Sequence, residues 1–488
     1  MDIATYSIRR PVNVWLLILI CFLGGVFGYL HVNRLEDPEF TIKEAVVVTP
    51  YPGADAEQVE HEVTEVLETV VQRMPQLDEM ETRSLPGLSE LRITIRDEFQ
   101  SEEMTQVWDE LRRRLSDAQG QLPPGADAPI VNDDFGDVFG IYYALTGEGL
   151  TITELHEAAK IIRRGLLEAD GVGQIDIAGV INLEYIVEVP QAQLAALDVS
   201  PQELAAAIED AQTELAVGNI RAGGLSLRVS PTGSYGSLEA LRLLPVGTGD
   251  SRLLLGDIAT VRQGLAEQPA QIVTYDGKPA ITLGIAGLSG INIVDVGEAV
   301  QRRLSEIAPD IPAGVELHSI YDQPQVVEEA INSFVFDLLI SLAIVAVCLC
   351  LVMGLKAGVI ISTVLLLSVG GTLLAMFVMA LDLERVSLAG LIIAMGMLVD
   401  NALVVVDGIQ VRMRRGSSAV RAAKETLQST QWSLFGATVI GILAFAGIGL
   451  SQDSTGEFMF SLFAVVAISL SLSWILGVTV PPMLGYYW

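Results

Sequence analysis

Six uninterrupted apolar runs, each long enough to cross a lipid bilayer, constrain this chain more than any other feature. A bilayer core about 30 Å thick takes roughly 20 apolar residues as a helix. The sequence therefore predicts six membrane-spanning helices, at residues 12–30, 334–353, 358–381, 386–406, 432–450 and 458–480. The first run is too long for the apolar core of a signal peptide and no small-residue cleavage site follows it, so we expect it to be retained.

The charge distribution predicts which side of the membrane each segment faces. Residues 32–333 hold 20 Lys and Arg against 51 Asp and Glu, which accounts for the whole net charge of −31. Basic residues outside this segment cluster before the first run and after the second and fourth, at Arg9, Arg10, Lys356, Arg412, Arg414, Arg415, Arg421 and Lys424. The positive-inside rule therefore predicts cytoplasmic termini and an external acidic domain. We interpret the acidity as a solvated surface in preference to cation capture, and it argues against nucleic acid as a partner.

The external segment alternates strand and helix patterns. In its first part, strands are predicted at 45–49 and 91–95, and helices at 55–71 and 102–115. Later strands are predicted at 141–145, 174–178, 183–189, 280–286 and 315–320, with helices at 153–169 and 295–307. These are βαβ units in the split arrangement of ferredoxin-like folds, with an insertion between residues 180 and 268.

Motifs for catalysis or metal binding are absent from the sequence. It contains no phosphate-binding loop, no nucleophile elbow and no HExxH motif. The four histidines are not at ligand spacing, so we predict no metal site, no cofactor and no enzymatic activity. The three cysteines all lie in apolar runs, so the external domain has no disulfide.

Asp400 is the most informative single residue, because it lies inside the fourth apolar run. A charged Asp at mid-span costs about 2.5–3.5 kcal/mol on insertion scales, so it needs a partner or a purpose. Carrying a proton would be such a purpose, with Asn401 as a neutral donor and acceptor beside it. The alternative is a packing role, in which Asp400 is hydrogen-bonded to a neighbouring helix. Asp337 and Asp407, near the ends of their runs, are candidates either for a proton path or for solvated end positions.

Glycines recur inside the runs at spacings that allow two helices to approach closely. The pairs Gly24–Gly28 and Gly370–Gly371 are the clearest examples. A further series lies in the fifth run, at Gly436, Gly441, Gly447 and Gly449. We interpret all of these as helix-packing sites.

Residues 399–407, Val-Asp-Asn-Ala-Leu-Val-Val-Val-Asp, resemble the fourth-span signature of RND (resistance-nodulation-division) transporters, in which an Asp belongs to the proton relay. Shorter matches follow in the family's order along the chain, at 51–56, 122–125, 171–173, 255–259 and 321–322. Together with the arrangement of one run before the domain and five after it, they resemble the N-terminal half of an acriflavine-resistance (hydrophobe–amphiphile) efflux permease.

The resemblance implies an α-helical membrane protein with six transmembrane helices in a 1+5 arrangement and a large periplasmic α/β domain. Porter subdomains of ferredoxin-like βαβ type and an inserted docking subdomain make up that domain. The implied divisions are the first transmembrane helix with its cytoplasmic N-terminus (1–31), the first porter subdomain (32–133), the second porter subdomain (134–179 and 269–333), the docking insertion (180–268) and transmembrane helices two to six (334–488).

The resemblance also implies proton-driven export of amphiphilic drugs, dyes and detergents, with protons as the coupling ion. Asp400 and Asn401 would form the proton relay. Phe139 and Tyr142 are our own candidates for substrate contacts in the porter domain, with core aromatics of a strand as the alternative. The implied partners are two further copies in a homotrimer, a periplasmic adaptor (membrane fusion) protein, an outer-membrane channel and the lipid bilayer. The implied location is the inner membrane of a Gram-negative bacterium, with 32–333 in the periplasm.

Three departures from the family pattern qualify this expectation. Many drug exporters have two adjacent acids in the fourth span, whereas the second position here is Asn401. Ala178 stands where drug-exporting relatives often have a pocket phenylalanine. The chain ends at Trp488, and no Lys or Arg lies within a predicted span to answer Asp400. We therefore expect a missing C-terminal half, or a second chain, to supply the Lys that the family pairs with its relay acid.

Two alternatives remain open at this stage. One is a heavy-metal exporter of the same family, for which the methionines of the porter region are Met74, Met80 and Met104. The other is a non-transporting membrane receptor or assembly factor, which predicts that Asp400 is dispensable.

Overall fold

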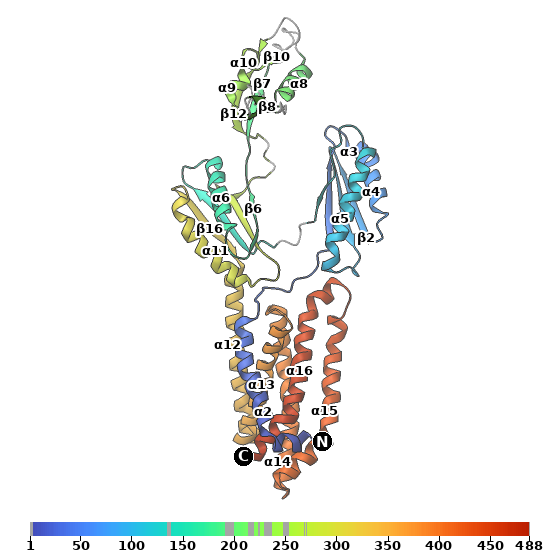
Figure 1. Ribbon diagram of the computed structural model, residues 1–488, viewed down its shortest axis with the longest axis vertical. Coiled ribbons are helices and arrows are strands. Elements are labelled where there is room, and N and C mark those ends of the chain that lie inside the picture. Colours follow the sequence, from blue (N-terminus) through green and yellow to red (C-terminus); the bar gives the residue numbers. More distant parts are fainter. Residues whose placement is uncertain are drawn as a thin grey trace.

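The computed structural model describes residues 3–133, 138–190, 200–212, 219–222, 225–228, 237–246, 253–267, 269 and 271–487. Among them, six helices are long and apolar enough to cross a membrane. They are α2 (Pro11–His31), α12 (Gln323–Met353), α13 (Leu355–Val378), α14 (Arg385–Arg414), α15 (Ala419–Gly449) and α16 (Ser454–Tyr487). In Figure 1 these helices form one bundle, the sheets stand beyond one end of it, and both chain termini lie near the other end.

Helices α12, α14 and α15 extend beyond the apolar runs that predicted them into polar sequence. Helix α12 begins at Gln323, directly after a strand, where the Asp322 side chain accepts a hydrogen bond from the backbone N–H of Gln325 (3.3 Å). Helix α15 begins at Ala419 and α14 continues to Arg414. The extensions are rich in Ala, Arg, Glu and Gln, which favour helix without being apolar, so a search for apolar runs finds only the central part. A short helix, α1 (Ile3–Arg9), precedes α2.

The first αβ unit has a four-stranded antiparallel sheet of order β2-β3-β1-β4. Its elements are β1 (Glu44–Pro50), a helix made of α3 (Ala56–Val59), the π-helical turn η1 (Glu60–Thr64) and α4 (Glu65–Val71), then β2 (Leu77–Leu85), β3 (Leu88–Ile95), α5 (Ser101–Ala118), the 3-10 turn η2 (Gln119–Gln121) and β4 (Ile130–Asn132). The helices cover one face of the sheet, where Val47, Leu67, Leu91 and Leu111 are fully buried. This is the β-α-β-β-α-β order of ferredoxin-like folds.

Strand β2 is an element that the sequence pattern did not predict. Its residues, Leu-Asp-Glu-Met-Glu-Thr-Arg-Ser-Leu, are mostly charged or polar and mostly exposed. It pairs with β3 alone and forms an edge of the sheet. An edge strand with little buried surface lacks the apolar alternation by which a strand is recognised.

The second αβ unit repeats the same topology. Its elements are β5 (Ile141–Gly147), α6 (Ile152–Leu166), β6 (Val172–Ala178), β15 (Ile281–Gly287), α11 (Ile293–Ile307), the 3-10 turn η3 (Ala308–Asp310) and β16 (Val315–Asp322). The sheet order is β16-β5-β15-β6, again all antiparallel. Tyr143, Leu145, Ile162 and Leu283 lie in its core. The predicted strands and helices of this unit are confirmed to within a few residues.

A smaller unit is inserted between β6 and β15, and it stands at the far end of the molecule from the helix bundle (Figure 1). Its described elements are β7 (Leu183–Glu188), α8 (Pro201–Gln212), β8 (Asn219–Ala222), β9 (Leu225–Arg228), α9 (Leu238–Arg242), β10 (Pro245–Val246), β11 (Leu253–Leu254), α10 (Leu255–Ile258) and β12 (Thr260–Leu265). Two short strands, β13 (Thr274–Tyr275) and β14 (Lys278–Pro279), lead back to β15. The predicted subdomain limits at 134 and 268 fall on residues outside those described.

Glycines bring α2 and α13 into backbone contact. A Cβ added to Gly25 would lie 2.5 Å from the Cα of Gly370, and one added to Gly28 would lie 2.6 Å from the carbonyl oxygen of Leu373. The predicted packing role of Gly28 and Gly370 is thereby confirmed, with Gly25 as the closest contact. In α15 the prediction holds for two of the four glycines: an added Cβ would meet Phe463 at Gly449 and Leu470 at Gly441 (3.2 Å), both on α16, whereas Gly436 and Gly447 meet open space among the described residues.

Candidate functional site

Helix α14 carries the predicted relay residues, and its start is fixed by a reciprocal cap. Glu384 Oε2 accepts hydrogen bonds from the backbone N–H groups of Val386 (2.7 Å) and Ser387 (3.2 Å). The hydroxyl of Ser387 in turn accepts from the backbone N–H of Glu384 (2.9 Å). Both ends of this capping box satisfy backbone donors that a helix otherwise leaves free. The register of α14, and with it the direction of Asp400, is therefore set at the end of the helix that lies towards the αβ units, here called its outer end.

Asn401 is buried between α14 and α16, with 6% of its surface exposed. Its Nδ2 donates to Ser473 Oγ (3.2 Å), and the Ser473 hydroxyl donates to the carbonyl oxygen of Leu398 (2.8 Å). A Cβ added to Gly477 would lie 3.1 Å from the Asn401 Cβ, so a glycine at 477 allows the two helices to approach here. Asn401 is a fixed link between α14 and its neighbour.

Asp400 is exposed on a different side of the same helix, because consecutive residues of a helix point in different directions. Within the described part of the chain, no hydrogen bond or ion pair reaches its carboxylate. Gly396, one turn earlier, meets open space. The contact that a packing role for Asp400 would require is therefore not found in the described structure, and the carboxylate lies on a face of α14 that this chain leaves open.

The other two candidate carboxylates are also exposed. Asp407 lies two turns beyond Asp400, about 10 Å along the helix axis, towards the end of α14 that carries Arg412. Asp337 lies on α12. No hydrogen bond joins either of them to Asp400 among the described residues. The structure thus places Asp400 and Asp407 on one helix and does not bring Asp337 into contact with them.

Phe139 and Tyr142 lie on the face of the second sheet that α6 and α11 do not cover. The Phe139 ring packs on Gly284, where an added Cβ would lie 2.8 Å from its Cγ. The Tyr142 hydroxyl donates to Thr282 Oγ1 (2.9 Å). Ala178 is the partner of Thr282 on the neighbouring strand and shares this face. The two predicted contact residues therefore belong to one surface, with a small residue beside them.

A model of the AcrB/AcrD/AcrF family matches residues 3–486, nearly the whole chain. The chain belongs to this family. Its members are RND-type export permeases, so this AcrB/AcrD/AcrF chain is a multi-pass membrane transport protein and not an enzyme. The match also agrees with a membrane-embedded helical region that carries a large mixed α/β domain.

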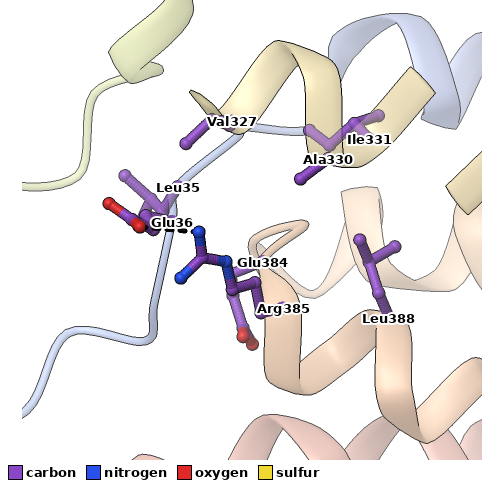
Figure 2. A pocket seen from close by; sticks show the side chains of 8 residues that line it. All are labelled: Leu35, Glu36, Val327, Ala330, Ile331, Glu384, Arg385 and Leu388. Carbon is purple, nitrogen blue, oxygen red and sulfur yellow. Dashed lines mark ion pairs between the residues drawn. The ribbon is translucent and has the colours of Figure 1, made fainter. Parts of the chain in front are cut away.

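The sequence did not predict the contacts between Glu36 and the start of α14, which we call the Glu36–Arg385 junction (Figure 2). Glu36 forms an ion pair with Arg385 (2.8 Å), and its second oxygen accepts a hydrogen bond from the Tyr321 hydroxyl (2.7 Å). That hydrogen bond to a carboxylate raises the pKa of Tyr321 to about 12. One feature of the sequence could have indicated this ion pair. Arg385 is a single basic residue after Asp382 and Glu384, and residues 36–39, far away in sequence, are acidic.

Glu384, next to Arg385, is a buried carboxylate at this junction. Only 2% of its surface is exposed. Burial raises the pKa of its carboxyl group, while the hydrogen bonds from the backbone N–H groups of Ser387 and Val386 act in the opposite direction. The start of the Asp400 helix is thus a desolvated polar site.

The Asn401–Ser473 link makes a first prediction. Ser473→Ala removes the hydroxyl that accepts from the buried Asn401 amide and donates to the Leu398 carbonyl; that carbonyl keeps its place in the helix, but the Asn401 Nδ2 group is left unpaired. Such losses cost about 1–3 kcal/mol, so we expect a lower unfolding temperature for the purified protein in detergent. The matched control is Ser433→Ala on an exposed position of α15. Equal unfolding temperatures for the two variants would contradict the structural role of Ser473.

Proposed function

We propose that this chain works as the N-terminal half of a proton-driven exporter of amphiphilic small molecules, with Asp400 as the proton carrier and Asn401 beside it in the relay. The observation that carries the proposal is a carboxylate at the middle of a spanning helix, on an open face, in a chain of the AcrB/AcrD/AcrF family. An uncompensated charge at this depth is costly and, in membrane proteins, usually functional.

The open face of α14 supports the need for a second half or second chain. Gly396, Asp400, Val404 and Asp407 follow one another along it at helical spacing. A glycine at 396 would let another helix come close, and a Lys on that helix would answer Asp400 directly. In this arrangement Asp337 and Asp407 guide protons towards and away from Asp400.

The energetics of such a carrier are adequate for export. One elementary charge moving through 100 mV releases about 2.3 kcal/mol, whereas a tenfold solute gradient requires about 1.4 kcal/mol. One proton per 100 mV can thus support a gradient of roughly 50-fold.

The surface around Phe139 and Tyr142 supports amphiphilic cargo. It combines the partly exposed rings of Phe139 and Tyr142 with a hydroxyl group, and the small side chain of Ala178 is paired with Thr282 on the same face. A heavy-metal cargo receives no comparable support, because Met74 and Met104 are buried in the core of the first αβ unit and Met80 packs against that core. Methionine sulfur buried in this way is a packing group and not an available ligand.

The assembly that we propose follows the family. Three copies, each completed by its second half, work with a periplasmic adaptor and an outer-membrane channel in the inner membrane of a Gram-negative bacterium. Residues 32–333 then lie in the periplasm, with 32–133 and 134–179 plus 269–333 as porter subdomains and 180–268 as the docking subdomain. The insertion of a separate small unit between β6 and β15 supports this division.

Efflux of a fluorescent cationic dye from exporter-deficient cells tests the proposal. We compare the chain alone, the chain with a matching C-terminal half, and that half alone, at equal membrane abundance. Export by the pair only is the expected result. Absence of export from an inserted and correctly folded pair would refute the transport function, and export by the chain alone would refute the half-transporter.

A further inference from the structure

Three basic side chains lie at the inner end of the helix bundle, the end away from the αβ units, where helices α2 and α13 begin. Arg9 and Arg10 join α1 to α2, and Lys356 is in the first turn of α13. All three are exposed. The first turns of α2 and α13 contain no acidic residue that would offset these charges. We call the three residues the basic corner.

The two arginines of the basic corner have no partner within the described part of the chain. No hydrogen bond or ion pair among those residues reaches the guanidinium group of Arg9 or of Arg10. Arginine groups with a role in holding the fold together usually contact a carboxylate or a carbonyl oxygen, as Arg412 does with Gly408 in this bundle. The donors of Arg9 and Arg10 are therefore available to a ligand.

The basic corner lies at a single depth in the membrane, because α2 and α13 run in the same direction and in contact. A Cβ added to Gly25 of α2 would lie 2.5 Å from the Cα of Gly370 on α13. Arg10 precedes Gly25 by 15 positions and Lys356 precedes Gly370 by 14 positions. Both charges thus lie about 21–23 Å along the helices from this contact. Val14, one turn after Arg10, belongs to the same buried apolar cluster as the first turn of α13, so the two helices are still packed together there.

That depth corresponds to the headgroup layer of the membrane. Trp15 is 54% exposed on α2, and tryptophan is enriched where the hydrocarbon core meets the headgroups. Arg10 lies five positions before Trp15, about 7 Å along the chain axis. The headgroup layer on each side of a bilayer is about 5–8 Å thick. Val12 and Leu355, which flank the charges, are 75% exposed and face the same surroundings.

A second set of arginines at the inner end lies too far out to contact headgroups in this way. Arg414 and Arg415 are in the turn between α14 and α15, and Arg421 follows in the first turn of α15. Trp432, 72% exposed, marks the interface on α15. Arg421 precedes it by 11 positions, about 16 Å along the helix. Figure 1 shows the ends of α14 and α15 projecting farthest from the αβ units. We call Arg414, Arg415 and Arg421 the hairpin arginines.

We propose that the basic corner binds a phospholipid with a net negative headgroup. The lipid phosphate accepts charge-assisted hydrogen bonds from Arg9, Arg10 and Lys356, and its acyl chains lie along the exposed apolar residues at the start of α2 and α13. One basic residue near an anionic membrane surface favours binding about 5-fold, so three together favour it on the order of 100-fold. A soluble phosphate ion would have no use for the apolar neighbours, and for this reason we assign the site to a lipid.

Native mass spectrometry tests this inference on the full chain, delipidated in detergent and titrated with phosphatidylglycerol or phosphatidylcholine. We expect the first phosphatidylglycerol to bind on the order of 100-fold more tightly than phosphatidylcholine. Replacing all three residues of the basic corner by glutamine should raise the dissociation constant for phosphatidylglycerol by the same order. Lys356→Gln alone should raise it about 5-fold.

Matched variants separate a defined site from the general attraction of a positively charged surface. Glutamine at all three hairpin arginines removes the same charge from exposed positions on the same side of the membrane, and should leave the dissociation constant unchanged. Arg9→Lys with Arg10→Lys keeps the charge and should keep the preference for phosphatidylglycerol. The unfolding temperature without added lipid shows whether each variant is folded. Lys356→Gln carries the test if the triple variant of the basic corner is not.

Three results would overturn the inference. The first is an equal loss of affinity in the two triple variants, which would indicate diffuse attraction. The second is equal binding of the two lipids by the parent chain. The third is displacement of phosphatidylglycerol by inorganic phosphate but not by sodium chloride at the same ionic strength, which would indicate a site for free anions. Loss of phosphatidylglycerol only when the basic corner is changed, with phosphate unable to displace it, is the result that supports the lipid site.

Discussion

We expect Asp400→Asn to abolish dye export by the paired halves while leaving membrane abundance unchanged. The amide has nearly the size of the carboxyl group but cannot bind and release a proton, so no coupling ion is carried. One proton moving through 100 mV can support a dye gradient of at most roughly 50-fold. The variant should support no gradient. Because Asp400 makes no hydrogen bond or ion pair in the described structure, the change removes no stabilising contact within this chain.

Asp400→Glu is the matched control for this experiment. It retains a carboxyl group at the same position and should keep a measurable part of the export. Dye accumulation against time in energised cells, with and without a protonophore, measures both variants. Export by Asp400→Asn at the parent rate would exclude the carrier role and favour a receptor or assembly factor built on the same fold.

Gly25→Val prevents the packing of α2 on α13. The new side chain would begin 2.5 Å from the Cα of Gly370, a backbone atom that cannot yield without separating the helices. The consequence should exceed about 4 kcal/mol, the range in which single substitutions are exceptional. We expect loss of the folded protein from the membrane fraction and no cooperative unfolding transition for what remains.

Gly447→Val tests whether a Gly-to-Val change within a span is itself destabilising. Gly447 lies in a spanning helix and meets open space, so the added side chain displaces nothing in the described structure. We expect nearly parental abundance for this variant. Similar losses in both variants would show that the change of residue type, and not the α2–α13 contact, is responsible.

The second αβ unit was predictable because its strands and helices bury regular apolar faces, such as Leu155, Ile162 and Leu166 on α6. Strand β2 was not, because its position at the sheet edge leaves few apolar residues to form a pattern. The spanning helices were located by their apolar runs, but their polar extensions carry no such signal. Periodicity reports burial, so elements with little burial escape it.

The sequence identifies the residue types of the candidate site, but it does not show which of them faces a neighbouring helix. A carboxylate in an apolar run marks Asp400 whatever the surroundings, and helical geometry separates it from Asn401. Which of the two faces α16 depends on residues such as Ser473 and Gly477, far along the chain. The Glu36–Arg385 junction was missed for the same reason, because ion pairs between distant segments leave no local pattern.

The ion pair between Lys43, just before β1, and Glu457, at the start of α16 (3.2 Å), determines when this protein can finish folding. The first αβ unit has a core of its own residues and can form while the chain is still being made, whereas the core of the second unit extends to residues of α13, α14 and α16. Lys43, however, precedes its partner Glu457 by 414 positions. At about 5–20 residues per second, ribosomes need roughly 20 to 80 s to close that interval. During this time Lys43 has its Asp97 contacts but lacks Glu457, so the first unit stays without this attachment until the sixth helix has been made.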